Sequence, residues 1–190
     1  MPDSLAREDV LPRLRGLFGR DYRYVESTPS TQLLIASDAP EGTVAVAGEQ
    51  TAGRGRLGRR WLAPAGTSLL CSVQLRPRVA PRHLPELTGI AARATAEAIE
   101  TVTGLAPELK EPNDLLVGGR KVAGVLAEAR EDRVVLGIGI NVNIDAADLP
   151  TEIDLPATSL LVESGRTDRA ELLVELLDRL ERRYTSWLSA

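Results

Sequence analysis

The chain has 190 residues, a length that suits one domain with a sizeable core rather than two full domains. Hydrophobic residues make up 43% of it, charged residues 26%, and the formal net charge is −4. This composition indicates neither a nucleic-acid-binding nor a membrane protein. Cys71 is the single cysteine and His83 the single histidine, which excludes an internal disulfide and disfavours a zinc site or a Ser-His-Asp triad. Because the N-terminus also lacks the features of a signal peptide, we expect a cytoplasmic protein.

The first half of the chain is predicted to contain two short helices followed by two strands. Apolar residues at helical spacing predict a short amphipathic helix over 9–18. Ser30 and Thr31 are good N-cap residues, so a second helix is expected to follow them. Residues 43–48 and 67–75 read as strands, and Cys71 lies in the apolar run of the second, where we expect a core thiol.

The second half contains the clearest local signals. Apolar residues from Leu87 to Val102 line one face of a long predicted helix. Gly118-Gly119 between the apolar runs 115–117 and 121–129 predicts a β-hairpin, and 133–142 is expected to extend the antiparallel sheet. Such an order of helices and hairpins, without regular βαβ alternation, indicates an α+β fold with a mixed sheet flanked by helices.

The last segment is predicted to be a loop followed by a helix. Residues 145–156 contain four acids and two prolines and are typical of a loop. Asp168 with Glu171 resembles a capping box, and apolar residues at helical spacing continue the helix to about Trp187.

A loop rich in glycine and arginine is the most informative segment. Residues 49–61 read Glu-Gln-Thr-Ala-Gly-Arg-Gly-Arg-Leu-Gly-Arg-Arg-Trp, in which the arginines suit phosphate or carboxylate and the glycines permit close approach. Gly53, Gly55 and Gly58 also match the dinucleotide-binding pattern, but neither the helix nor the acid that this pattern needs follows. An RNA-binding tract and a merely solvated loop remain as alternatives.

Three further segments are candidates for chemistry. One is Lys110-Glu111-Pro112-Asn113-Asp114, in which the lysine could bind phosphate and the aspartate could bind it through Mg²⁺. The same residues are also typical of an ordinary surface turn. Lys121 begins an apolar strand, either as a fixed positive charge in a site or as a surface strand end. Gly137-Ile138-Gly139-Ile140-Asn141 places glycines where a ligand or another backbone could approach, and Asn141 could read a base edge.

The rare residues of the chain fall in these segments. Only two of the 23 basic residues are lysines, Lys110 and Lys121, and the three asparagines are Asn113, Asn141 and Asn143. Because nearly every other basic residue is an arginine, a lysine at these two positions suggests a need for a compact ammonium group.

Together these segments resemble the catalytic domain of biotin protein ligases. That family has a Ser-Thr-Asn start, a Gln-x-x-Gly-Arg-Gly-Arg-x-Gly-Arg-x-Trp loop, Lys-Trp-Pro-Asn-Asp, Lys-x-x-Gly and Gly-x-Gly-x-Asn. The matching segments lie in the same order and span about residues 25–145: Ser30-Thr31-Gln32, Gln50–Trp61, Lys110–Asp114, Lys121–Gly124 and Gly137–Asn141. The two lysines of this chain fall on the two motif lysines.

The resemblance implies a fold related to class II aminoacyl-tRNA synthetases and a two-step reaction. Biotin and MgATP would give biotinyl-5′-AMP, and a lysine of a biotin carboxyl carrier protein domain, in a biotin-dependent carboxylase, would then take the biotin. Catalysis would depend on positioning and charge stabilisation, without a protein nucleophile.

The resemblance also implies roles for individual residues. Lys121, Arg54 and Lys110 would be catalytic, and Asp114 would hold Mg²⁺. Biotin would contact a set of mostly small and polar residues: Ser30, Thr31, Gln32, Gln50, Gly53, Arg54, Gly55, Arg56, Lys121 and Gly124. ATP would contact Arg56, Trp61, Lys110, Asn113, Asp114, Lys121 and Asn141.

The sequence departs from the family pattern in several respects. Gln32 replaces the usual asparagine and Glu111 the usual tryptophan, so a carboxylate stands close to where the triphosphate is expected. A single catalytic domain over residues 1–190 is expected, without the N-terminal DNA-binding domain or the C-terminal β-barrel of other members; DNA binding is therefore not expected, and a homodimer is possible. Alternatives are a non-catalytic biotin-binding homologue and a lipoate or octanoyl transferase, although the latter lack the arginine loop.

Overall fold

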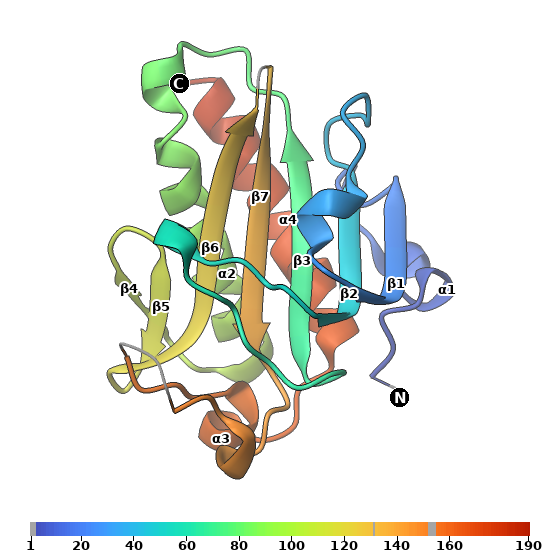
Figure 1. Cartoon of the computed structure of the whole chain (residues 1–190). Coiled ribbons are helices and arrows are strands. Elements are labelled where there is room, and N and C mark those ends of the chain that lie inside the picture. Colours follow the sequence, from blue (N-terminus) through green and yellow to red (C-terminus); the bar gives the residue numbers. More distant parts are fainter. Residues whose placement is uncertain (1–2, 131, 152–154) are drawn as a thin grey trace.

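The computed structural model describes residues 3–130, 132–151 and 155–190, which form a seven-stranded mixed sheet (Figure 1). The strand order is β1-β2-β3-β7-β6-β5-β4; β1 pairs in parallel with β2, and the other neighbours are antiparallel. This arrangement confirms the expected α+β class. The strands are β1 (Tyr22–Thr28), β2 (Val44–Gln50), β3 (Ser68–Leu75), β4 (Glu108–Lys110), β5 (Asp114–Val117), β6 (Arg120–Arg130) and β7 (Arg133–Asn141).

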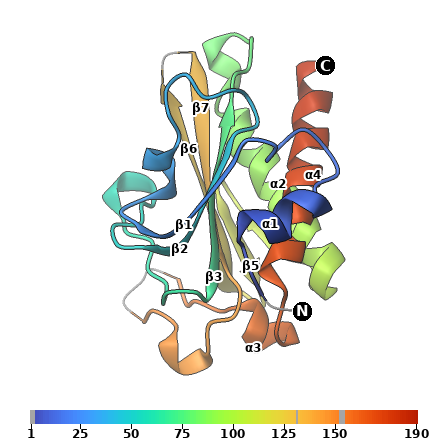
Figure 2. The same cartoon turned by 90° about the vertical axis from the view of Figure 1, so that its right-hand side faces the viewer.

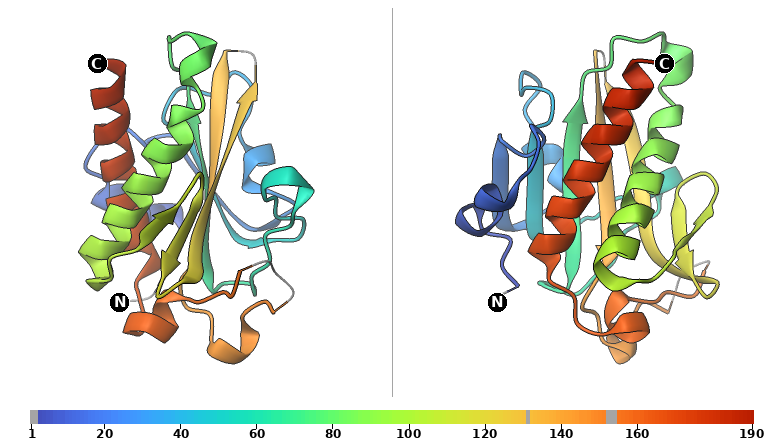
Figure 3. Two further views of the ribbon diagram at one scale, coloured as in Figure 1. Left: turned by 90° about the vertical axis from the view of Figure 1, so that its left-hand side faces the viewer. Right: turned by 180° about the vertical axis from the view of Figure 1, so that it is seen from behind.

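Two long helices, α2 (Glu86–Thr103) and α4 (Arg169–Leu188), cover one face of the sheet (Figures 2 and 3). Their apolar faces and the facing side chains of the central strands form the main core. The opposite face carries loops and short 3-10 turns instead of long helices (Figure 2). In the part of the chain that the structure describes, no helix is long and apolar enough to cross a membrane. One face of the sheet thus packs against the two long helices, and the other face is available for a binding site.

Local sequence signals predicted these two helices and the β5–β6 hairpin correctly. The α2 helix ends at Gly104, whose φ of 75° lies in the left-handed region that favours glycine. At the start of α4 the Asp168 carboxylate accepts the backbone N–H of Ala170 at 2.8 Å and that of Glu171 at 3.3 Å. Between β5 and β6 the turn residues Gly118 and Gly119 have φ values of 56° and 76°, as a two-residue hairpin with a primed turn requires.

The predicted helix over 9–18 is wrong. Helix α1 spans only Arg7–Val10, and a 3-10 turn follows at Leu11–Arg13. After Pro12 the chain turns, and the Glu181 carboxylate of α4 accepts the backbone N–H groups of Leu17 and Phe18 at 2.8–3.0 Å. A distant carboxylate therefore satisfies donors that a continuing helix would have used internally.

Other elements also differ from expectation. The helix expected after Ser30-Thr31 is a single 3-10 turn, Thr31–Leu34. Strands β1 and β4 and the short helix α3 (Leu160–Ser164) were not predicted. The expected loop over 145–156 contains a 3-10 turn at Ala146–Asp148, and its residues 152–154 lie outside the described residues.

Candidate active site

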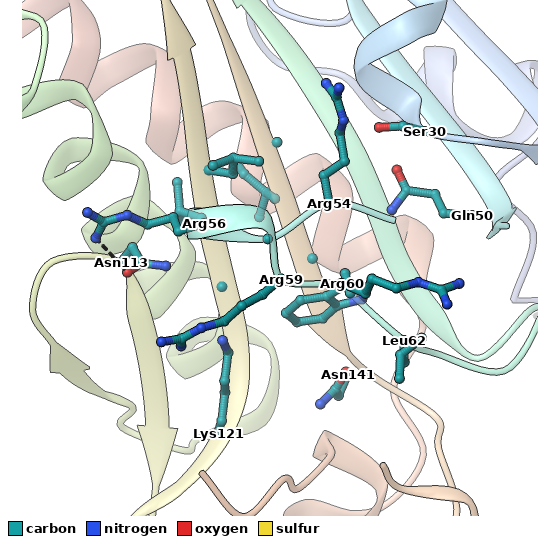
Figure 4. Close-up of a pocket in the computed structure, with 18 of the residues that line it drawn as sticks. Ser30, Gln50, Arg54, Arg56, Arg59, Arg60, Leu62, Asn113, Lys121 and Asn141 are labelled. Atoms are coloured by element: carbon teal, nitrogen blue, oxygen red, sulfur yellow. Dashed lines mark hydrogen bonds between the residues drawn. The ribbon is translucent and has the colours of Figure 1, made fainter. Parts of the chain in front are cut away.

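A cavity of about 420 Å³ lies on the sheet face that α2 and α4 leave uncovered (Figure 4). Its volume is within the range of about 300–1,000 Å³ typical of small-molecule sites. The loop after β2 forms one wall, and strands β6 and β7 form the floor. Polar side chains from widely separated segments meet there: Ser30, Thr31, Gln32, Gln50, Arg54, Arg56, Arg59, Arg60, Asn113, Lys121 and Asn141.

The glycine-arginine loop, residues 49–61, is closed by backbone hydrogen bonds between its two arms. The Trp61 N–H donates to the Gly53 carbonyl at 3.0 Å, and the Gly55 N–H donates to the Arg59 carbonyl at 2.7 Å. A Cβ on Gly53 would lie only 2.5 Å from the Trp61 carbonyl oxygen, so this closure requires glycine. At the tip Leu57 has a φ of 57° and is 87% exposed. A left-handed leucine costs about 1–2 kcal/mol, so the rest of the loop must hold this shape.

Trp61 packs flat against the floor of the cavity. Gly124 of β6 and Gly139 of β7 are direct partners across the two strands, and a Cβ on Gly139 would meet ring atoms of Trp61 at 2.7–2.8 Å. The strand glycines thus admit a side chain of the same protein. Trp61 Nε1 and Asn141 Oδ1 are both buried without a hydrogen-bond partner among the described residues. One free donor and one free acceptor therefore border the same space.

Lys121 lies at the start of β6 and is held from several directions. Its Nζ is 2.7 Å from Asp114 Oδ1 and 5.6 Å from the centre of the Trp61 ring. Its backbone N–H donates to the Pro156 carbonyl at 2.7 Å, and its carbonyl accepts the Thr158 N–H at 2.9 Å. The side chain is only 25% exposed, so this positive charge is fixed on rigid structure and partly shielded from water.

The loop arginines are paired with residues at the margins of the cavity. Arg54 Nη1 is 3.2 Å from Glu128 Oε1, and in Figure 4 its side chain points away from Lys121. Arg56 Nη1 donates to Asn113 Oδ1 at 3.0 Å. Both pairs are largely solvent-exposed and so worth at most about 1 kcal/mol, which an anionic ligand could readily exceed.

One end of the cavity is a buried polar cluster. Thr31 donates through its N–H and its hydroxyl to Gln50 Oε1, at 2.8 and 3.0 Å, and its hydroxyl also lies 2.7 Å from Ser72 Oγ. Gln50 Oε1 is therefore committed, which leaves its amide nitrogen as the group able to donate to a ligand. Ser30 and Gln32, each 3% exposed, complete this end. The cluster suits a compact polar group rather than a triphosphate.

The apolar part of the floor lies between these polar ends. Cys71, Val125 and Ile138 contribute to it from three neighbouring strands. Burial raises the pKa of the Cys71 thiol to about 12. The thiol is thus protonated at neutral pH, and the expectation of a core thiol is confirmed.

Comparison with known proteins assigns the chain to a family. Residues 24–145 match the model of the biotin/lipoate A/B protein ligase family, a stretch that contains the loop, both lysines and strands β2 to β7. The chain belongs to this family. The polar residues of the cavity described above lie within the matched stretch.

Curated relatives are biotin ligases. The bifunctional ligase/repressor BirA of Bacillus subtilis is 40% identical over 199 residues, covering 99% of this chain and 61% of that protein. The biotin–[acetyl-CoA-carboxylase] ligase of Mycobacterium tuberculosis is 39% identical over 155 residues, covering 79% of this chain and 57% of that protein. The predicted resemblance to biotin protein ligases is confirmed, and the chain spans about three fifths of the length of these relatives.

Among solved structures, the fold matches the biotin protein ligase of Aquifex aeolicus in complex with biotin and ATP. The TM-score is 0.81 with 35% identity, over 90% of this chain and 72% of that one. This likeness confirms both the fold class and the biotin protein ligase-like arrangement of the sheet.

Most of the residues predicted for biotin and ATP line the cavity of this family member; Gly53, Lys110 and Asp114 do not. Gly53 lies beneath the Trp61 backbone, where it shapes the loop. Asp114 reaches the site indirectly through Lys121. Lys110 is exposed on β4, and its role with phosphate stays a prediction. Glu111 is exposed as well and is not a lining residue, so its carboxylate is not directed into the cavity.

Several lining residues were not predicted. Arg59 and Arg60 belong to the recognised loop but had no assigned role, and the alternation Gly137, Gly139, Asn141 could have indicated which face of β7 is concerned. For the wall formed by Pro150, Leu155 and Ala157 the sequence carries no comparable signal.

Proposed function

We propose that this domain joins biotin to ATP and then transfers the biotin to a lysine of a carrier domain in a biotin-dependent carboxylase. The observation that carries the proposal is the cavity itself, in which a compact polar pocket, an apolar floor and a row of cations follow one another. Two named relatives support it: the Mycobacterium tuberculosis ligase acts on acetyl-CoA carboxylase, and the Aquifex aeolicus ligase was solved with biotin and ATP.

The first step brings two anions together. A carboxylate oxygen of biotin would attack the α-phosphorus of MgATP, the bond to the bridging oxygen of the β-phosphate would break, and pyrophosphate would leave. Lys121 is suited to hold the carboxylate and α-phosphate oxygens because its ammonium is compact, fixed and only partly exposed. Arg54 and Arg56 would leave Glu128 and Asn113 to close over the remaining charge.

The second step needs no protein nucleophile. The neutral amine of the carrier lysine would attack the acyl carbon of biotinyl-AMP, an amide bond would form, and AMP would leave while the amine gives up a proton. Positioning of the mixed anhydride by the cavity would then be the main contribution of the protein.

The two ends of the cavity would separate the substrates. Ser30, Thr31, Gln32 and Gln50 would surround the polar ring end of biotin, whose carbonyl and N–H groups need both donors and acceptors. At the other end, the unpartnered Trp61 Nε1 and Asn141 Oδ1 would contact adenine. Gly55 and Gly124 also line the cavity, and Gly124 would contribute by leaving room for the Trp61 ring.

Mg²⁺ would enter with the triphosphate. Among the described residues no group of three or more His, Cys, Asp or Glu side chains forms a metal site, so phosphate oxygens and water must supply most of the ligands. Asp114, which already accepts from Lys121 and from Asn113 at 3.1 Å, would be a carboxylate near that ion. Lys110 would serve the outer phosphates.

Release of pyrophosphate from ATP, measured with biotin, lipoate or octanoate as the acid, tests this proposal. Biotin is expected to stimulate release and the other two acids are not. Stimulation by lipoate or octanoate instead would indicate the other branch of the family, and biotin binding without any release would indicate a non-catalytic homologue.

A further inference from the structure

A three-residue segment, Pro156–Thr158, extends the sheet beside Lys121. Strand β7 ends at Asn141, whereas β6 begins at Arg120, three residues before Ala123, its first residue that pairs with β7. The vacant place next to Lys121 is taken by this segment, which pairs in parallel through the two backbone hydrogen bonds at 2.7 and 2.9 Å. The backbone of Lys121 is therefore held between β5 and a segment 35 residues further along the chain.

The same segment also holds Asn141. Asn141 Nδ2 donates to the Thr158 carbonyl at 2.9 Å, which leaves Oδ1 directed into the buried space without a partner. Ala157, between the two pairing residues, lines the cavity. The position of this segment thus determines where two groups of the proposed nucleotide end lie.

Glu163 of α3 fixes the segment from behind. Its carboxylate accepts the hydroxyl of Thr158 and forms an ion pair with Arg120 Nη2 at 2.7 Å. Arg120 directly precedes Lys121, so one carboxylate ties the segment and the start of β6 together. The Glu163 side chain is 14% exposed and Thr158 is fully buried, which shields their contact from competing water, whereas the Arg120 side chain is 45% exposed.

We propose that Glu163 is a positioning residue for nucleotide binding. It acts through Thr158 and Arg120, and it touches neither substrate. By keeping Pro156–Thr158 against β6 it holds the Lys121 ammonium and the Asn141 amide at the spacing that the α-phosphate and adenine require. The polar pocket for the ring end of biotin lies on other elements, at β2, β3 and the turn Thr31–Leu34, so biotin would keep most of its contacts if Lys121 shifted. This inference rests on the proposed function.

The test compares substitutions of Glu163 and of Thr158, the two partners of one hydrogen bond. Glu163→Ala is expected to raise the KM for ATP about tenfold, because one charged hydrogen bond and one ion pair are lost, while the KM for biotin stays within about twofold. Thr158→Val removes the hydroxyl and is expected to act in the same direction, whereas Thr158→Ser keeps the hydroxyl and should match the wild type. The matched control is Glu97→Gln, which breaks the Glu97–Arg183 ion pair between α2 and α4, on the opposite face, and should leave both KM values unchanged.

Several outcomes would overturn the inference. Equal rises in the two KM values, or a lower melting temperature with unchanged KM for ATP, would show a merely structural role. A Thr158→Ser variant as impaired as Thr158→Val would exclude the hydroxyl contact. The wild type could bind MgATP in calorimetry without turning it over. That result would contradict the proposed function but not this inference, which the MgATP affinities of the same variants would then test. A wild type that binds no MgATP would contradict both.

Discussion

Replacing Lys121 with alanine separates its contribution to stability from its proposed role in adenylation. The ammonium forms a partly buried pair with Asp114, with side-chain exposures of 25% and 15%, so its loss leaves one carboxylate short of a charged partner. We expect a loss of about 1–2 kcal/mol in the free energy of unfolding, between the values for exposed and buried pairs. For a domain of this size that corresponds to a fall of about 2–8 °C in melting temperature. The fold itself should persist, because Lys121 pairs with its neighbours through backbone atoms.

The effect of Lys121→Ala on adenylation should be far larger. Removal of one fixed group that stabilises transition-state charge typically costs a factor of about 10²–10³ in kcat. Lys121→Arg is the matched variant: it keeps the charge opposite Asp114 and is expected to melt close to the wild type, yet to remain strongly impaired because a planar guanidinium replaces a compact ammonium. Circular dichroism melts and pyrophosphate release measure the two quantities on the same samples. Wild-type turnover by Lys121→Ala would refute the role assigned to this lysine.

Three further substitutions examine other contacts of the site. Gly139→Ala should displace the Trp61 ring and lower stability by about 1–3 kcal/mol, since the new Cβ would lie 2.7 Å from a ring carbon; unchanged melting and tryptophan emission would argue against this packing. Glu128→Gln should release Arg54 and lower the KM for ATP or biotin by at most about fivefold, the most that an exposed pair allows, and a higher KM would mean that Glu128 helps to bind. Glu111→Trp should retain or raise adenylation, because Glu111 is exposed outside the cavity; an inactive variant would reveal a function of that carboxylate.

Elements specified by local patterns could be predicted from the sequence. The long helices α2 and α4 follow from apolar spacing and capping residues, and the β5–β6 hairpin follows from Gly118-Gly119. Strand β1 was missed because it is an edge strand with little burial, and only its parallel pairing with β2 defines it. The wrong helix over 9–18 has a similar cause, since the distant Glu181 holds the turn there.

The candidate site, like the fold, could be predicted from the sequence only in part. Motif residues such as Gln50 and Lys121 carry their chemistry in the sequence, and they do line one cavity. Other features of the site depend on contacts between segments far apart in the chain. Trp61 fills the space over Gly139, and Thr158 pairs with the backbone of Lys121. No local pattern encodes such contacts, and the sequence therefore predicted many residues that line the cavity but not the contacts that position them.

The most direct test of the account is to mix the purified domain with biotin and MgATP, without any carrier protein, and to look for biotinyl-5′-AMP by mass spectrometry. We expect the adenylate to form with the wild type and to be reduced at least about a hundredfold with Lys121→Ala. Absence of the adenylate from a wild-type sample that still binds both biotin and MgATP would contradict the proposed activity.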